Sequence, residues 1–139
     1  MIKPFKKWAF DFVGPINPTS LNKKHVLVCT DFVTKWVEAK ALSFATKRVV
    51  VDFLFTEIFT RFGVPREIVY DNGLQFISNT VQGVMEQYKV RHRKSTPYHL
   101  QENGQVESTN KVIESILTKM VNMHRKDWVD KLPEALWAY

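Results

Sequence analysis

Hydrophobic and polar positions alternate clearly at residues 7–13. An aromatic side chain occupies every second position, with smaller or charged residues between. A period of two is typical of a β-strand that turns one face to the protein core. The two sets are Trp8, Phe10 and Phe12 on one face and Ala9, Asp11 and Val13 on the other. The Gly14–Pro15 pair predicts the end of this strand.

Two more strands are expected before the first helix, at residues 25–32 and 36–41. The first is rich in Val and Leu, and polar, turn-forming segments flank both. Because the links are short, the three strands are expected to form an antiparallel meander. Asp31 lies where the second strand meets its turn, so we interpret it as a structural residue.

Residues 45–62 have the three- and four-residue spacing of a helix with one broad apolar face. Its apolar positions are Val51, Leu54, Phe55, Ile58, Phe59 and Phe62. Gly63 and Pro65 predict its end, and residues 67–70 predict a short buried strand. A helix between two strands is typical of a crossover connection, so this strand is expected to lie parallel to the first.

The remaining chain predicts three helices and one strand. A helix is expected at residues 78–88 with Ser78 as a possible N-cap, followed by a basic strand at 89–94. Residues 95–102 lack periodicity and are interpreted as a loop. The next helix is expected to begin at Asn103, as its N-cap, and to run to about Met123. A last helix is predicted at 128–139, so the elements together predict an α/β fold.

Composition points to one folded domain with an anionic partner. The chain has 139 residues, 45% of them hydrophobic, and a formal net charge of +6. This charge favours nucleic acid, although it could also serve solubility alone. The single Cys29 is expected to be a small buried residue, and the scattered histidines predict no zinc site. No segment resembles a signal peptide or a membrane span, so a soluble, intracellular protein is expected.

Three carboxylates occupy unusual places. Asp11 lies within an apolar strand, Asp71 directly follows the strand at 67–70, and Glu107 is expected in the first turn of its helix. Each has an ordinary alternative: a capped turn for Asp11, an Asn–Gly turn after Asp71, and a helix-dipole interaction for Glu107. Together they could converge on two hard divalent cations that assist phosphoryl transfer.

The chain resembles the catalytic core of retroviral and long-terminal-repeat retrotransposon integrases, most closely the gypsy class found in plants. The resemblance covers nearly the whole chain. The segments that carry it are residues 8–15, 34–39 and 61–65, Asp71-Asn72-Gly73, Gln75-Phe76, Asn103-Gly104-Gln105-Val106-Glu107 and residues 136–139. It implies a ribonuclease H-like fold, with a five-stranded mixed sheet flanked by helices. It also implies that Asp11, Asp71 and Glu107 are catalytic residues that bind two Mg²⁺ or Mn²⁺ ions.

The resemblance further implies DNA integration: the enzyme trims the 3′ ends of element DNA and joins them to target DNA. Expected partners are both DNAs and further copies of the chain, in the nucleus or a cytoplasmic element particle. Basic or polar residues near the acidic motif are expected to contact DNA. They are Asn72, Lys89, Arg91, Arg93, Lys94, Tyr98, His99, Gln101, Asn103, Asn110 and Lys111.

Some positions depart from the family pattern. The family usually has Pro at the position of Leu100, a small residue at Glu102, Arg or Ala at Ser108, and Ser or Thr at Tyr70. The flanking zinc-binding and carboxy-terminal domains have no counterpart, so residues 1–139 are expected to be a core truncated at both ends. Two alternatives to an integrase remain. One is a catalytically decayed nucleic-acid-binding or assembly module, and the other is a nuclease acting on RNA–DNA hybrids.

Overall fold

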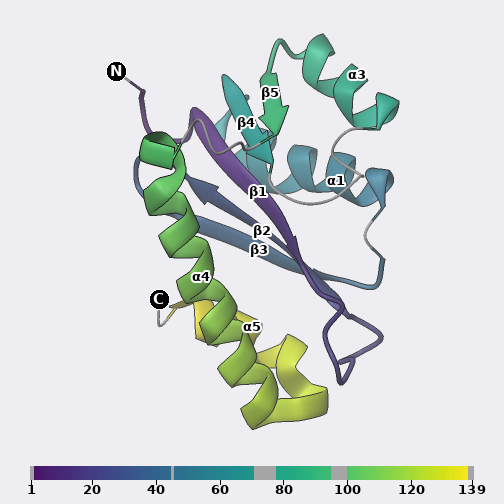
Figure 1. Ribbon diagram of the computed structural model, residues 1–139. Coiled ribbons are helices and arrows are strands. Elements are labelled where there is room, and N and C mark those ends of the chain that lie inside the picture. Colours follow the sequence, from purple (N-terminus) through teal and green to yellow (C-terminus); the bar gives the residue numbers. More distant parts are fainter. Residues whose placement is uncertain (1, 45, 71–77, 95–99, 138–139) are drawn as a thin grey trace.

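The computed structural model describes residues 2–44, 46–70, 78–94 and 100–137, with the backbone alone at residues 100–110 and 137. A five-stranded sheet forms the centre of the molecule, in the order β3-β2-β1-β4-β5 (Figure 1). The strands are β1 (Lys7–Val13), β2 (His25–Asp31), β3 (Val37–Leu42), β4 (Glu67–Tyr70) and β5 (Arg91–Lys94). The bounds of β1 and β4 coincide with those expected from the sequence.

The sheet is mixed, as predicted. β1, β2 and β3 form the antiparallel meander, whereas β4 lies parallel to β1 and β5 lies parallel to β4. β1 is therefore the central strand, and Trp8 lies between Asp31 of β2 and Ile68 of β4. The parallel pairing confirms that the helical segment after β3 crosses over the sheet.

Helices cover both faces of the sheet (Figure 1). One face carries a continuous helical segment made of α1 (Lys47–Phe53), η1 (Leu54–Phe59) and α2 (Thr60–Phe62), together with α3 (Asn79–Gln87). The other face carries α4 (Leu100–His124), the short η4 (Arg125–Asp127) and α5 (Trp128–Trp137). Among the described residues, no helix is long and apolar enough to span a membrane.

The alternation along β1 separates two hydrophobic clusters. Trp8 and Phe10 belong to the cluster beneath α1, η1 and α3, where Phe53 packs edge-on against Phe10 with ring centroids 5.9 Å apart. Val13 packs against the other cluster, beneath α4 and α5. Because side chains alternate along a strand, Asp11 lies on the face of Val13, under α4.

Local signals place the helices close to their expected bounds. The Thr46 side chain caps α1 by accepting from Val49 N at 3.3 Å, and Ser78 caps α3 by accepting from Val81 N at 3.3 Å. Gly63 ends α2 with a φ of +89°, a conformation that glycine adopts at little cost. The Ser78 cap and the Gly63 stop confirm two of the sequence predictions.

The predicted start of the α4 helix is wrong. α4 begins at Leu100, so Asn103 lies inside the helix rather than at its N-cap, and Glu107 is its eighth residue rather than part of its first turn. Residues 100–102, which we interpreted as loop, are helical as well. Leu, Gln and Glu are good helix formers, and Gly104 costs only about 1 kcal/mol relative to Ala inside a helix. The high helix propensity of the flanking residues therefore lets α4 continue through Gly104.

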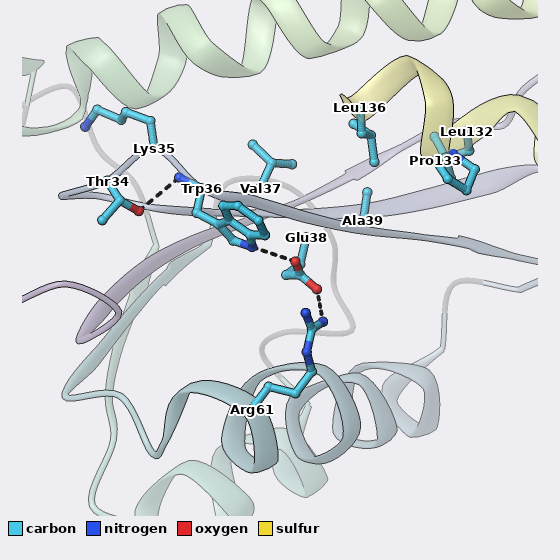
Figure 2. Close-up of a pocket in the computed structure, with 10 residues that line it drawn as sticks. All are labelled: Thr34, Lys35, Trp36, Val37, Glu38, Ala39, Arg61, Leu132, Pro133 and Leu136. Carbon is cyan, nitrogen blue, oxygen red and sulfur yellow. Dashed lines mark hydrogen bonds and ion pairs between the residues drawn. The ribbon is translucent and has the colours of Figure 1, made fainter. Parts of the chain in front are cut away.

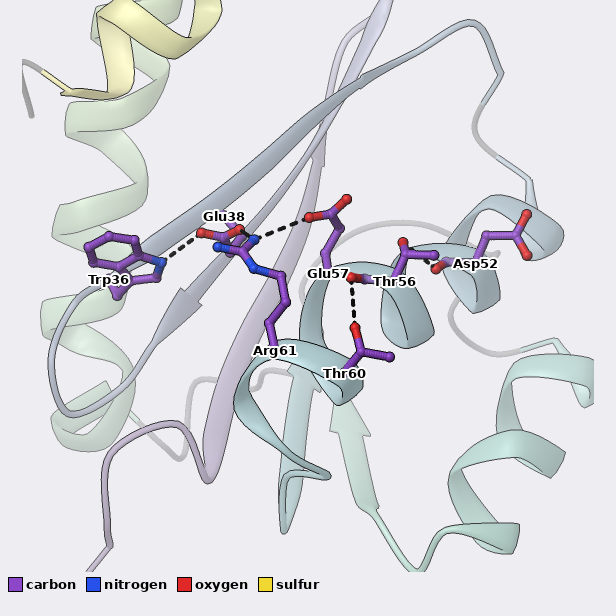
Figure 3. A network of polar contacts seen from close by, with 7 residues as sticks. All are labelled: Trp36, Glu38, Asp52, Thr56, Glu57, Thr60 and Arg61. Carbon is purple, nitrogen blue, oxygen red and sulfur yellow. Dashed lines mark hydrogen bonds and ion pairs between the residues drawn. The ribbon is translucent and has the colours of Figure 1, made fainter.

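The helix at residues 45–62 is not regular. Its middle is π-helical, and the Thr60 backbone N–H donates to Phe55 O, five residues earlier. The Thr56 and Thr60 hydroxyls donate to the carbonyls of residues 52 and 56 at 2.8 and 3.0 Å (Figure 3). Such side-chain bonds compete with the regular backbone pattern. The sequence pattern predicted a regular helix here and not this π-helical segment.

Asp31 connects three parts of the chain and is fully buried. Its Oδ1 accepts from Phe5 N at 2.9 Å, and its Oδ2 accepts from Thr34 N at 2.8 Å and Thr34 Oγ1 at 2.7 Å. The carboxylate thus fixes the segment before β1 and the turn after β2. The interpretation of Asp31 as structural agrees with this arrangement.

We predict that Asp31→Ala lowers the free energy of unfolding by about 2–4 kcal/mol, because three donors lose a charged acceptor. Urea denaturation followed by circular dichroism measures this loss. The matched control, Asp127→Ala, removes an exposed carboxylate and should change stability by less than about 0.5 kcal/mol. Equal effects of the two substitutions would contradict the role given to Asp31.

Candidate active site

Asp11 is the acidic residue whose surroundings the structure describes most fully. It is the fifth residue of β1, pairs with Val28 of β2, and is only 6% exposed. β1 continues for two residues beyond it, so Asp11 is not a turn cap at the strand end. A carboxylate buried on the sheet face covered by α4 is costly unless cations or hydrogen-bond donors compensate its charge.

The second acidic position follows β4. Tyr70 ends β4 and lies opposite Phe10, the residue that precedes Asp11. The backbone therefore brings the carboxyl end of β4 alongside Asp11, and Asp71 is the next residue of the chain. Asp71 lies outside the described residues, so its convergence with Asp11 stays a prediction. Ligands commonly bind at this end of parallel strands in open α/β sheets.

The third acidic position belongs to α4. Ile113 and Leu117 of this helix pack against Val26 and Val28 of β2, on the sheet face that Asp11 shares. The backbone of Glu107 lies in α4, six residues before Ile113, but its side chain is outside the description. Asp11 thus belongs to β1 and Glu107 to the helix packed on the same sheet face, whereas Asp71 follows β4 in the sequence.

The donor chemistry of these residues fits hard divalent cations. Three carboxylates would offer only oxygen ligands, which Mg²⁺ prefers. No group of three His, Cys, Asp or Glu side chains comes together among the described residues. The described side chains include Asp11 but neither of its two predicted partners, so the triad stays a prediction.

Most residues predicted to contact DNA are also ones whose side chains the structure does not describe. Asn72, Tyr98 and His99 are outside the described residues. The structure gives only the backbone of Gln101, Asn103 and Asn110, all within α4. Lys111 is exposed on α4. Their roles stay predictions.

The basic residues of strand β5 differ in their exposure and in their partners. Lys94 is exposed and lies opposite Tyr70, at the end of the sheet that leads to Asp71. Arg91 is also exposed but lies opposite Glu67, at the other end. Arg93 is half-buried, and its Nε donates to Glu67 Oε1 at 2.9 Å. Of the three, Lys94 is best placed to bind a phosphate beside the acidic residues.

An ion network connects the beginnings of β1, β4 and β5. Lys7 Nζ lies 3.5 Å from Glu67 Oε2 and 4.5 Å from the centroid of the Phe32 ring. Lys7 is almost completely buried, and this burial lowers the pKa of its ammonium. Burial alone would raise the pKa of Glu67, but the hydrogen bond from Arg93 and the charge of Lys7 hold it below 4.5.

A groove beside β3 was not anticipated by the sequence analysis. It has a volume of about 680 Å³ and lies between β3, Arg61 and α5 (Figure 2). Trp36, which is 49% exposed, donates from Nε1 to Glu38 Oε2 at 2.6 Å. Arg61 forms ion pairs with Glu38 and Glu57 (Figure 3). A tryptophan next to a polar turn is the only sequence signal that could have indicated this exposed site.

The integrase core domain family matches residues 2–99 of the chain. The Gag-Pol polyprotein of gibbon ape leukemia virus is 36% identical over 135 residues, and the Pol polyprotein of radiation murine leukemia virus is 35% identical over 136. These matches cover 96% and 97% of this chain, but only 8% and 23% of the two viral proteins. The chain therefore spans a small part of each relative.

Solved structures support the fold. The chain aligns with a simian T-cell lymphotropic virus intasome bound to the PP2A regulatory subunit B56 gamma, with a TM-score of 0.74 and 24% identity. It also aligns with the HTLV-2 integrase catalytic core in complex with magnesium, with a TM-score of 0.70 and 23% identity. Both alignments cover 97% of this chain, and they cover 48% and 84% of those chains. The predicted ribonuclease H-like fold is confirmed.

We predict that Glu67→Gln reduces the pH dependence of stability. Because the folded-state pKa of Glu67 is depressed, its contribution is present above about pH 4.5 and is lost as the pH falls through the folded-state value. Urea denaturation at about pH 7 and about pH 3 measures the difference, which should be smaller in Glu67→Gln. The exposed Glu86→Gln serves as control and should behave as the unsubstituted chain. An unchanged difference in Glu67→Gln would contradict the network.

Proposed function

Because the chain belongs to the integrase core domain family, we propose that it is the catalytic core of a polynucleotidyl transferase that carries out DNA integration. In the proposed reaction, water cleaves element DNA near its 3′ end. The freed 3′-hydroxyl then attacks a phosphodiester of target DNA. The observation that carries this proposal is the pairing of Phe10 with Tyr70, which puts Asp11 beside the strand that leads to Asp71.

The proposed roles of the acidic residues follow from the resemblance to the integrase family. Asp11 and Asp71 would hold one divalent cation, and Asp11 and Glu107 would hold the other. When bound, the two cations lower the pKa of the attacking water or hydroxyl and offset charge on the phosphate. The burial of Asp11 in a rigid central strand fixes its carboxylate and reduces the entropy lost when the reacting groups meet. No covalent link to the protein is needed.

Partners are part of the same proposal. Lys94 and Lys111 are both exposed and would bind DNA phosphates beside the reacting bond. The solved relatives are described as an intasome and as a trimeric form of a catalytic core. By analogy we propose that this chain acts as an oligomer with Mg²⁺ or Mn²⁺. We also propose that its source is a gypsy-class retrotransposon of the kind found in plants.

A decayed, non-catalytic module of the same fold is the second candidate. Leu100 and Glu102 depart from the family pattern, and both belong to the first turn of α4, the helix that carries Glu107. A changed entry into this helix would displace the Glu107 carboxylate. A negative charge at Glu102 would also repel nearby phosphates.

We predict that the chain resolves a labelled, branched DNA substrate in the presence of Mn²⁺ and that Asp11→Asn reduces the rate at least about 100-fold. Gel electrophoresis of the products measures this rate, and circular dichroism checks the fold. Asp130→Asn makes the same chemical change on α5 and should keep the full rate. Activity of Asp11→Asn near that of the unsubstituted chain would contradict the assignment.

If the unsubstituted chain is inactive, a second variant distinguishes the remaining candidate functions. Leu100→Pro with Glu102→Thr restores residues that the family pattern expects. A gain of metal-dependent resolution would show that the fold retains its chemistry. Persistent inactivity would favour the decayed module, and cleavage only of an RNA–DNA hybrid would favour a nuclease.

We also predict that residues 1–139 alone do not join two element ends to one target. This reaction requires several protomers to align three DNA segments, and lost orientation can cost several kcal/mol of barrier. A branched substrate already holds its reacting groups together, so it should still react. Product mapping on a supercoiled plasmid distinguishes the two reactions. Efficient two-ended joining by this chain would contradict the orientation argument.

A further inference from the structure

Positive charge gathers at the amino-terminal ends of β1, β4 and β5. Seven cations and two carboxylates lie in this region, which we call the amino-end cluster. Its members are Lys3, Lys6, Lys7, Lys35, Arg66, Arg91 and Arg93, with Asp31 and Glu67. Their sum is +5, compared with a formal net charge of +6 for the whole chain. Most of the chain's excess charge is therefore concentrated at one end of its sheet.

Backbone hydrogen bonds fix the positions of three cluster residues. The N–H groups of Arg66 and Glu67 donate to Lys6 O at 2.8 and 3.1 Å, and Arg91 N donates to Arg66 O at 2.9 Å. The backbones of Lys6, Arg66 and Arg91 are therefore neighbours because strands β1, β4 and β5 begin side by side.

The two carboxylates of the cluster already have partners. Glu67 binds Lys7 and Arg93, and Asp31 accepts from Phe5 and Thr34. Within the described part of the chain, no carboxylate lies within 4.0 Å of Lys6, Arg66 or Arg91. Arg66 and Arg91 are also exposed. Their guanidinium groups are thus available to an external anion.

The pKa of the buried Lys7 depends on burial and on the charged groups around it. Its pKa is lowered by burial and by the charges of Arg93 and Arg91, although Glu67 acts in the opposite direction. Arg93 and Arg91 therefore repel the Lys7 ammonium. An external polyanion would relieve this repulsion.

We propose that Lys6, Arg66 and Arg91 form a binding site for the phosphate backbone of duplex DNA, at the amino-terminal ends of β1, β4 and β5. This inference rests on the proposed function. The three residue steps from Arg91 to Lys94 cover about 10 Å of β5, or about three nucleotides along one DNA strand. One duplex can therefore contact Lys94 beside the reacting phosphate and the amino-end cluster beyond it. Guanidinium forks match phosphate geometry better than point charges do.

The test measures how duplex binding depends on salt. Fluorescence anisotropy of a labelled duplex oligonucleotide gives the slope of log K against log salt concentration. Each lost phosphate contact reduces this slope by about 0.9, so Arg66→Gln with Arg91→Gln should reduce it by about 1.8. The control pair, Arg125→Gln with Lys126→Gln, removes the same charge from exposed residues after α4 and should change it by less than about 0.5. Circular dichroism confirms folding of both variants.

The outcomes separate this site from the proposed function. An unchanged slope in Arg66→Gln with Arg91→Gln, with metal-dependent resolution of branched DNA intact in the unsubstituted chain, overturns the site alone. An equal reduction of the slope in this variant and in the control variant also overturns the site, because the effect would then follow from net charge alone. Arg66→Gln with Arg91→Gln could instead lose binding to labelled polyglutamate and keep its salt slope on duplex DNA. The partner is then an acidic protein and the DNA site is wrong. Absence of duplex binding by the unsubstituted chain contradicts both proposals.

Discussion

The parallel pairing of β1 with β4 is the contact on which the candidate site depends. Phe10 lies opposite Tyr70, so the carboxyl end of β4 lies alongside Asp11. Trp8 and Phe10 fix β1 between the two hydrophobic layers, and both are essentially fully buried. Their burial, at about 25 cal/mol per Å² of apolar surface, favours one register of the central strand. A slip by one residue would turn Asp11 into the opposite hydrophobic cluster.

The two ends of the same strands have different chemistry. The carboxyl ends lead to the predicted acidic residues, whereas the amino ends carry Lys7, Glu67 and the exposed arginines. Glu67 neutralises part of this positive charge inside the fold and so stabilises the start of β4. Under the proposed function, this separation would keep the acidic residues that bind metal apart from part of the positive charge that binds DNA.

Sequence patterns predicted those parts of the fold that local rules determine. The alternation from Lys7 to Val13, the Ser78 cap and the Gly63 stop all correspond to structure. The start of α4 was wrong, because a glycine beside a capping residue does not stop a helix flanked by strong helix formers. The pairing of Arg93 with Glu67 and the groove at Trp36 depend on residues distant in the chain. No pattern within one segment contains that information. Of the predicted triad, the structure describes the surroundings of Asp11 alone.

Convergence of Asp11, Asp71 and Glu107 on divalent cations is the central claim, and paramagnetic NMR tests it most directly. Mn²⁺ broadens the signals of nearby backbone amides, and the effect falls steeply with distance. Titration of the isotope-labelled chain with small amounts of Mn²⁺ is expected to broaden signals first around residues 11, 71 and 107. Asp11→Asn is expected to remove this broadening at all three places together. Broadening centred elsewhere, or confined to only one of the three segments, would contradict the account.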